Sequence, residues 1–200
     1  IKGWWPEKMW GQKIFDILDS HKEPVDWETF LSINRANGEH HIGAPFFQPY
    51  FLKILQKFKA GDPRLEEVYR RMEAWPGKDL PNDPIVLVFN EWFMELMVEL
   101  LQPDFGFMVK RSMDRENLQI FGILCFRVLN PDKAGVALQA DYLHGRDPDD
   151  LALKCLNQVL DKCTKLHGKK IANWPYVPSK LSTDELGPIP NRGCGTYWMA

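Results

Sequence analysis

The segment PIVLVFNEWFMELMVELL, residues 84–101, constrains the fold more than any other part of the sequence. It is apolar on most sides, but Glu91, Glu95 and Glu99 follow one another at intervals of four residues. That spacing puts three carboxylates on one face of a helix. Three charges in one segment argue against a membrane span. The pattern therefore predicts a helix that is buried in a larger body and solvated along one acidic stripe.

Aspartate followed by proline predicts where helices begin, and the chain has this pair at Asp62-Pro63, Asp83-Pro84 and Asp147-Pro148. The aspartate carboxylate can accept the free backbone N–H groups of the first helical turn. Proline fits the first helical position because the N–H that it lacks would have no partner there. The first of these helices is expected to end near Ala74, since the turn sequence WPG follows.

The helix that begins at Pro148 is predicted to be amphipathic. Its apolar positions recur at spacings of three and four: Leu151, Cys155, Val159, Cys163 and Leu166. Lys165 and His167 precede Gly168, an order that is typical of a helix C-terminus. Both ends of this helix are therefore marked in the sequence.

Helical periodicity also extends over residues 11–21 and 26–58, and the second stretch is expected to break at GAPFFQP, residues 43–49. Residues 119–130, QIFGILCFRVLN, suit either a strand or a buried helix, and we favour a helix. The final residues TYWMA, 196–200, are β-branched, aromatic and apolar after a glycine-rich turn, which is typical of the start of a strand.

These patterns predict one segment over residues 1–200, mainly α with a few short strands. Residues 1–168 are expected to be mostly helical. Residues 169–200 are expected to be loop-rich, because proline and glycine are frequent there until the terminal strand. No internal repeat is apparent.

Composition excludes some partners. The 25 basic and 27 acidic residues are spread along the chain, without the clustered positive charge that nucleic acids or anionic membranes attract. A hydrophobic content of 44% supplies enough apolar material for a sizeable core. Aromatic residues make up 12% of the chain, and such side chains bury large areas in cores and interfaces.

The four cysteines form no CxxC pair: they are Cys125, Cys155, Cys163 and Cys194. We interpret them as reduced and packed, since most lie inside apolar runs. Cys163 and His167 are four residues apart and could meet a metal from one helix face. No second ligand pair accompanies them, so core cysteines and a capping histidine are the favoured interpretation. His40 and His41 are neighbours in GEHHIG and are interpreted as part of a solvated or interfacial turn.

A nucleophile is not marked by any local motif. Cys125 or Cys194 paired with His144 stays open, because catalytic partners need not be close in sequence. The chain has no glycine-rich elbow around a serine, no phosphate loop and no dinucleotide fingerprint. By residue chemistry alone, the sequence predicts a scaffold.

The order of five segments carries a resemblance over nearly the whole chain. They are KIFDILDSHKEPVDWETFLSIN, FFQPYFLKILQKF, LEEVYRRMEAWPGKDLPNDP, ALKCLNQVLDKCTKLHGKKIANW and NRGCGTYWMA. Together with the apolar helix that follows the third, they resemble the C-terminal half of the large β chain of the penicillin acylase family of N-terminal-nucleophile hydrolases. The turn from Trp75 to Gly77 resembles the family's Trp-Asp-Gly turn with Pro76 in place of the acid, and Asn173-Trp174 resembles a family Asn-Trp pair. Each piece is common by itself, and the ordered set carries the resemblance.

The resemblance implies that the chain is a fragment of a larger four-layer αββα fold, to which the terminal strand would belong. A parent of this family hydrolyses the linear amide between an acyl group and an amine, as in penicillins. Its nucleophile is the serine, threonine or cysteine that begins the β chain, and an asparagine side chain helps to stabilise the oxyanion. These groups, and the calcium ligands of some members, would all lie upstream of Ile1.

Accordingly, the resemblance implies no catalytic, cofactor-binding or metal-binding residue in this chain, which would be inactive alone. Its partners would be the α chain, the N-terminal part of the β chain and, for the parent, a small amide substrate; no nucleic acid or membrane is expected. One family arginine should fall near the start of the first helix, where this chain has Trp10, with Lys8 and Lys13 as the nearest cations. Family members are often periplasmic or secreted.

Two other hypotheses come from different classes of protein. A non-catalytic helical interaction module would use the aromatic-rich termini, residues 3–10 and 195–200, as its interface. A free-standing Cys–His hydrolase would need a thiol nucleophile within these residues. The fragment hypothesis instead predicts a Gly-Ser, Gly-Thr or Gly-Cys processing point upstream in the parent reading frame.

Overall fold

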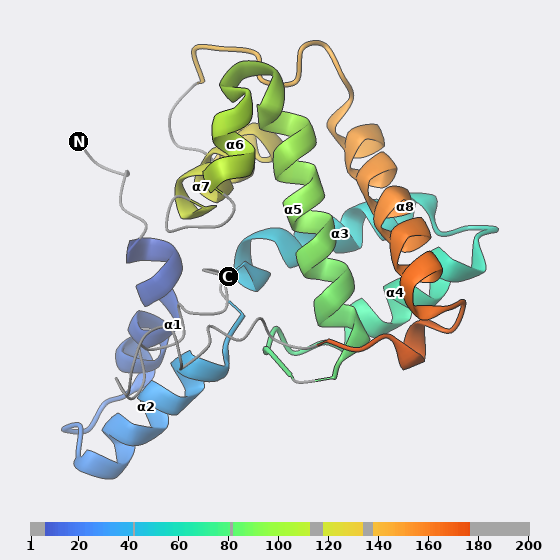
Figure 1. The fold of residues 1–200 in the computed structure, drawn as a ribbon. Helices are drawn as coiled ribbons and strands as arrows, with labels where there is room; N and C mark the ends of the chain where they lie inside the picture. The colour runs from blue at the N-terminus through green and yellow to red at the C-terminus, as the bar shows by residue number, and fades with distance from the viewer. Residues whose placement is uncertain (1–6, 42, 81, 113–117, 134–137, 177–200) are drawn as a thin grey trace.

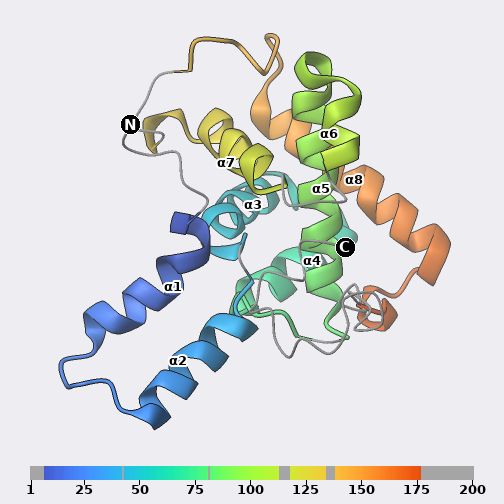
Figure 2. The same ribbon diagram turned by 60° about the vertical axis from the view of Figure 1, so that its left-hand side comes forward.

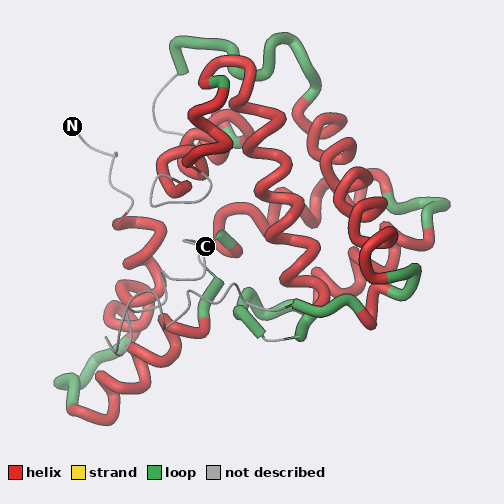
Figure 3. The backbone as a smooth tube through the Cα atoms, in the orientation of Figure 1, coloured by secondary structure: helices red, strands yellow, loops and turns green. Residues whose placement is uncertain are grey.

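A computed structural model describes residues 7–41, 43–80, 82–112, 118–133 and 138–176. The elements in these ranges are helical, and the pairing of extended backbone there is a single antiparallel bridge between His40 and Lys78. Figure 3 shows the same helical content along the chain. The mainly α fold is therefore confirmed, whereas the strand predicted at 196–200 lies outside the described residues.

The first helices in order are α1 (Glu7–Ser20), α2 (Trp27–Glu39), α3 (Ala44–Phe58), α4 (Pro63–Ala74) and α5 (Pro84–Phe105). After them come α6 (Phe107–Ser112), α7 (Leu118–Leu129), η1 (Pro131–Lys133), α8 (Pro148–His167) and η2 (Ile171–Asn173). Helix α5 runs through the middle of a body made by α3 to α8, and α1 and α2 extend away from that body as a helical pair (Figures 1 and 2).

The central position of α5 follows from its apolar surface. Its buried residues include Phe89, Trp92, Phe93 and Leu96, all essentially inaccessible to solvent. The indole N–H of Trp92 donates to the backbone carbonyl of Ala152 at 3.0 Å, so the one polar atom of that side chain is satisfied where α8 crosses. The prediction of a buried helix over residues 84–101 is thus confirmed.

The acidic stripe of α5 has a second role that the periodicity did not predict. Glu99 accepts from Lys154 at 2.8 Å, and Glu91 accepts from Lys162 at 2.6 Å. Both lysines belong to α8, so two of the three glutamates line the edge of the α5–α8 contact. Since these pairs are partly exposed, each contributes a modest stabilisation, on the order of 0.2–1 kcal/mol.

All three Asp-Pro pairs begin helices as predicted. Asp62 accepts from the backbone N–H of Arg64, Asp83 from that of Ile85, and Asp147 from those of Asp149 and Asp150. Helix α4 ends at Ala74 and α8 ends at His167, before Gly168 with φ of 87°. These ends agree with the sequence because a cap depends on groups within about four residues.

Two sequence expectations were wrong in detail. The break expected at 43–49 lies earlier, between Glu39 and Ala44, and Pro49 sits inside α3. Burial of Phe47, Tyr50 and Phe51 on both sides of that proline outweighs the one backbone hydrogen bond that it removes. Leu166 does not belong to the buried face of α8, since it is 66% exposed in the last turn.

The remaining ambiguous segment is a helix. Residues 119–130 lie almost wholly in α7, where Phe121 and Cys125 face the core and Phe126 packs edge-on against Phe46 and Phe47 of α3. Among the described helices, none combines the length and apolar character that crossing a membrane requires.

Candidate functional site

His41 and Asp149 are the buried polar residues of the part of the chain that the structure describes. Each is the centre of a cluster that joins distant segments. Buried polar groups cost free energy unless they are hydrogen-bonded, and perturbed groups of this kind often mark functional sites. The clusters around His41 and Asp149 are therefore the two candidate functional sites.

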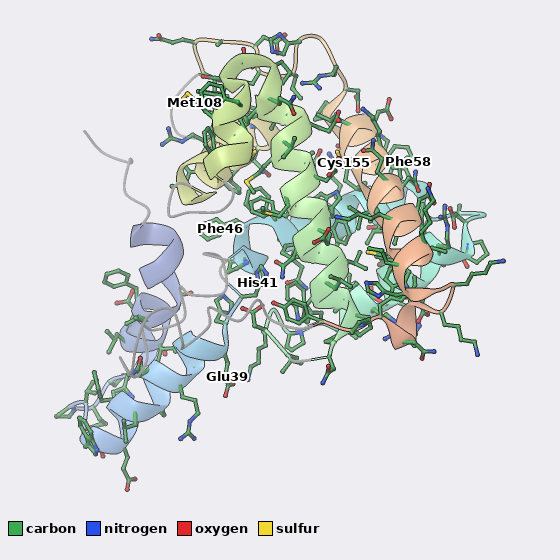
Figure 4. The ribbon with its side chains drawn as sticks, viewed as in Figure 1. Glu39, His41, Phe46, Phe58, Met108 and Cys155 are labelled. Carbon is green, nitrogen blue, oxygen red and sulfur yellow. The ribbon has the colours of Figure 1, made fainter. Side chains whose placement is uncertain are left out.

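His41 lies in the short link between α2 and α3 and is 1% exposed. Figure 4 shows it between the end of α2, marked by Glu39, and α5. Its Nε2 is 2.7 Å from Oδ1 of Asn90 on α5. The backbone N–H of Gly43 donates to its Nδ1 at 3.1 Å. Since Nδ1 accepts, the proton of the neutral ring is on Nε2, which donates to Asn90.

Aromatic rings enclose this imidazole. The ring centroid of His41 is 5.3 Å from that of Trp75 and 5.1 Å from that of Phe89, both in edge-to-face geometry. Beyond it, Nδ2 of Asn90 donates to the hydroxyl of Tyr176 at 3.3 Å. The hydrogen-bonded series His41, Asn90, Tyr176 thus connects the α2–α3 link, α5 and the segment after η2.

Asp79 stands beside His41 but does not form a strong ion pair with it. Oδ1 of Asp79 is 3.8 Å from Nε2 of His41, which is too long for a hydrogen bond. Burial lowers the pKa of His41 to about 4 and raises the pKa of Asp79 to about 7. Both shifts favour the uncharged forms, so at mildly acidic pH we interpret the contact as one between neutral groups.

Residues 75–79, which we call the strap, form a turn that places Asp79 beside His41. Its N–H donates to the carbonyl of Glu39 at 2.9 Å, and the N–H of His41 donates to the carbonyl of Gly77 at 2.9 Å. Trp75 closes the turn by donating from its indole N–H to the carbonyl of Lys78. Gly77 has φ of 71°, and a Cβ added to it would lie 3.2 Å from Cβ of Ala44. The turn therefore needs glycine for both its conformation and its space.

This arrangement is built for structure rather than for proton transfer. A general base needs a free lone pair within reach of a substrate proton. In His41 both ring nitrogens are engaged, the ring is enclosed by aromatic side chains, and protonation is disfavoured down to a pKa of about 4. The cluster instead holds three chain segments at fixed positions.

Asp149 organises the second cluster, in the first turn of α8. Its Oδ1 accepts from the hydroxyl of Tyr50 at 3.2 Å and from Nζ of Lys53 at 3.1 Å, and its Oδ2 accepts from Nζ of Lys57 at 3.0 Å. Burial opposes the charge of Asp149, but the hydrogen bonds from Lys57 and Lys53 prevail and lower its pKa. Burial, followed by the charge of Asp149, raises the pKa of Tyr50. Here an ionised carboxylate fastens α8 to α3.

A cavity of about 260 Å³ adjoins this cluster and opens to solvent. Seven residues line it, from α3 and from the end of α7 through η1: Pro49, Tyr50, Lys53, Leu129, Asn130, Pro131 and Asp132. The amine of Lys53 is already hydrogen-bonded to Asp149, and the Tyr50 hydroxyl donates to the same carboxylate. Two of the polar groups at this cavity are therefore already bound to Asp149.

The thiols are packed rather than reactive. Cys125, Cys155 and Cys163 are free and buried, as predicted, while Cys194 lies outside the described residues. Burial raises the pKa of Cys125, and it raises that of Cys155 to about 12. Few of these thiols are thiolates at neutral pH, and the thiolate is the nucleophilic form.

The two sequence-predicted pairs whose members are both described, Cys125 with His144 and Cys163 with His167, are not assembled. Cys125 is in the core, whereas half-exposed His144 has its Nε2 2.9 Å from Oδ2 of Asp104 at the surface. Cys163 is buried and His167 is exposed, so they do not face a common site. Trp10, Lys8 and Lys13 lie in α1, and their side chains are outside the described residues.

The interpretation of the GEHHIG histidines as a solvated or interfacial turn was wrong for His41. Sequence reasoning also missed Asn90, Asp79 and the role of Asp149. Asn90 left a signal, because it is the amide in an otherwise apolar segment and precedes the acidic stripe by one residue. A polar residue off the solvated face of a buried helix predicts a buried partner.

Comparison with known proteins supplies a family and a fold. The family model described as Penicillin amidase matches residues 1–194. A search of curated proteins finds no match. A solved structure, the thermostable penicillin G acylase from Alcaligenes faecalis in orthorhombic form, matches with a TM-score of 0.65 and 13% identity. The match covers 83% of this chain and 33% of that chain, so the present chain spans about a third of the length of the chain that it matches.

Proposed function

The chain belongs to the penicillin amidase family, and on that premise we propose that it is the helical C-terminal part of the β chain of an amidohydrolase. The whole enzyme would cleave the linear amide between an acyl group and an amine. The observation that carries the proposal is the family match over residues 1–194, which leaves almost none of the chain unexplained. The shared fold with a penicillin G acylase supports it independently.

Within that enzyme, the proposed role of this part is to hold the catalytic region in place. The nucleophile, its free α-amino group and the oxyanion asparagine would come from residues outside this chain. The engaged nitrogens of His41 and the high thiol pKa values of Cys125 and Cys155 support this assignment. None of these groups is prepared to attack a carbonyl carbon.

We propose that this chain departs from its family at Trp10. It stands near the position where the family resemblance places an arginine that organises the nucleophile region. An indole cannot supply the positive charge or the five N–H donors of a guanidinium. We propose that this enzyme organises that region without the arginine, with Lys8 or Lys13 as the nearest substitute cations.

Calcium, which some family members bind, is proposed to lie outside this chain. The described residues contain no cluster of three or more ligand side chains suited to a metal ion. The acidic side chains at the start of α8 already have partners. Asp147 caps the helix, and Asp149 binds two lysines. These carboxylates do not fit a cation site that needs six or more free oxygen ligands.

A second candidate function, a non-catalytic helical interaction module, is favoured by one observation. Trp27 and Phe30 of α2 are 70% and 49% exposed, which is unusual for aromatic side chains outside an interface. The hypothesis of an interaction module does not explain why the chain matches the family model over residues 1–194. It is compatible with the scaffold role, since a scaffold must contact the part that it supports.

The test uses a chromogenic phenylacetyl anilide as substrate. The 200-residue chain is incubated with it beside a version extended upstream through the candidate nucleophile. We expect hydrolysis by the extended version alone. Hydrolysis by the isolated chain would overturn the proposal, because a nucleophile would then lie within these residues. No hydrolysis by either version would remove the support for an amidohydrolase of this substrate class.

A further inference from the structure

Helices α1 and α2, with the link between them, expose an unusual amount of apolar surface. We call residues 7–39 the arm. Among the described side chains of the arm, six large apolar ones are exposed, and we call them the arm patch: Phe15, Leu18, Val25, Trp27, Phe30 and Leu31. The described body is larger than the arm, yet it exposes fewer such residues. The arm patch is therefore a local concentration of apolar surface.

Helical spacing makes part of this patch a continuous stripe. Trp27, Phe30 and Leu31 are related by three and four residues, so they share one face of α2. The rings of Trp27 and Phe30 stack with centroids 5.5 Å apart and an interplanar angle of 21°. Ile33, on another face of the same helix, is 6% exposed. Helix α2 thus buries one apolar side chain inward while a second apolar face remains outside.

Helix α1 repeats the pattern. Ile14 and Ile17 are partly buried, whereas Phe15 and Leu18 are exposed at a spacing of three. Two helices that only packed against each other would need one apolar face each. The second apolar face on both helices has no purpose in the arm itself.

The body does not use the arm patch. The hydrophobic core of the described residues begins at Ala44 and contains no residue of the arm. Figures 1 and 2 show from two directions that α1 and α2 extend away from α3 to α8. The chain also spans only about a third of the acylase chain that it matches, so most of such a protein lies outside it.

Charge narrows the identity of the partner. Between residues 14 and 36 the arm has the carboxylates Asp16, Asp19, Glu23, Asp26 and Glu28, against the cations Lys22 and Arg35. Two copies of the arm face to face would bring this acidic excess against itself, which costs free energy. A partner surface with apolar residues and a basic rim would complement it.

We propose that the arm patch docks on the part of the same acylase that lies outside this chain, on an apolar surface bordered by basic side chains. The proposal rests on the proposed function, because it takes the partner from the remainder of that enzyme. It adds which face of this part makes the contact and which residues anchor it. Trp27 and Phe30 are the anchors, since large aromatic side chains dominate the energetics of such contacts.

Hydrogen exchange followed by mass spectrometry tests the docking. The amides of α2 are compared in the isolated chain and in the acylase expressed from its complete reading frame. We expect exchange in α2 to slow at least about tenfold in the complete protein. Trp27→Ser should restore fast exchange there and leave the isolated chain unchanged. Leu166→Ser, at an equally exposed leucine of α8, is the matched control and should leave α2 protected.

Three results would overturn the proposal. One is equal exchange of α2 in both proteins. The second is a concentration-dependent dimer of the isolated chain that Trp27→Ser abolishes, because the occupant would then be a second copy. The third is faster α2 exchange in a chain shortened to residues 1–176, because the patch would then be covered by the chain's own residues 177–200.

Hydrolysis of the anilide separates this inference from the proposed function. An active complete enzyme with an unprotected α2 would refute the docking alone. An inactive complete protein with a protected α2 would refute the amidohydrolase alone.

Discussion

Nε2 of His41 lies 2.7 Å from Oδ1 of Asn90, and the two residues are 49 positions apart in the chain. The contact joins the link between α2 and α3 to the central helix α5. It satisfies two polar groups in a setting where water is excluded, since His41 is 1% exposed.

Replacing Asn90 with leucine should destabilise the chain by about 1–3 kcal/mol, because Nε2–H of His41 is left buried without its acceptor. Urea unfolding followed by circular dichroism measures the change. Glu95→Gln, on the partly exposed stripe of the same helix, is the control and should change the free energy of unfolding by less than about 0.5 kcal/mol. Equal effects of the two substitutions would refute the assigned role of Asn90.

The pH dependence of stability should reveal two opposing titrations. The pKa of His41 is lowered to about 4, so the unfolded state binds more protons between about 4 and 6.5, and this group makes stability rise with pH. The pKa of Asp79 is raised to about 7, so the folded state binds more protons between about 4 and 7, and this group makes stability fall with pH. In the native sequence the two contributions largely cancel between about pH 4 and 6.5.

Asp79→Asn removes one of the two titrations. The variant should therefore gain stability as pH rises from about 4 to 6.5, with a slope of at most about 1.4 kcal/mol per pH unit. At pH 8 it should be more stable than the native chain by about 1–4 kcal/mol, because the native Asp79 must ionise in a buried position. Unfolding by urea at a series of pH values checks this. A variant with the same pH profile as the native chain would contradict the assignment.

Asp149→Asn should loosen the attachment of α8 to α3. An amide has no negative charge to pair with the ammonium groups of Lys53 and Lys57. We expect the free energy of unfolding to fall by about 1–2 kcal/mol at pH 7. The loss is limited because both lysines are partly exposed to solvent. Because the pKa of Asp149 is lowered in the folded state, its contribution is present above the unfolded pKa and is lost as pH falls through the folded value. The difference between variant and native chain should therefore shrink in acid.

Asp150→Asn is the matched control for Asp149→Asn. Asp150 is the next residue of the same helical turn and is exposed, and its charge interacts with the helix dipole, which is worth about 0.3–1 kcal/mol, and at longer range with Lys57. A double-mutant cycle with Tyr50→Phe should show coupling to Asp149 and none to Asp150. Coupling of equal size to both would show that the Tyr50 hydrogen bond is not specific.

Gly77→Ala should cost more than Gly61→Ala. Both glycines have positive φ, 71° and 85°, so alanine strains the backbone at either site by about 1–2 kcal/mol. At Gly77 the new Cβ would also lie 3.2 Å from Cβ of Ala44, whereas at Gly61 no atom of the described residues, chain neighbours aside, lies within 4 Å of it. The midpoints of urea unfolding give the comparison, and equal losses would show that the strap can move away from α3 without cost.

The sequence predicted the elements whose causes are local. The three Asp-Pro caps, the end of α4 at Ala74 and the glycine after α8 all depend on groups within a few residues of one another, so spacing alone was sufficient. The acidic stripe of α5 was also predicted from local spacing, because its glutamates are four residues apart. The ordered set of such segments also resembled the family that the comparison then identified.

Where local and distant causes competed, the sequence was less informative. Pro49 reads as a helix breaker, but burial of its neighbours keeps it inside α3. Leu166 fits the apolar period of α8, but its side chain lies in the last turn outside the core and is 66% exposed. Each outcome depended on what lies opposite in the folded chain.

By itself, then, the sequence determined the helices, most of their ends and the family. Only the tertiary structure decided which polar residues are buried and what they bind. His41 and Asn90 are 49 residues apart, and Lys57 and Asp149 are 92 apart. Contacts at such separations form when apolar faces pack, and the position of each helix against the others sets them, which no periodicity along the chain contains.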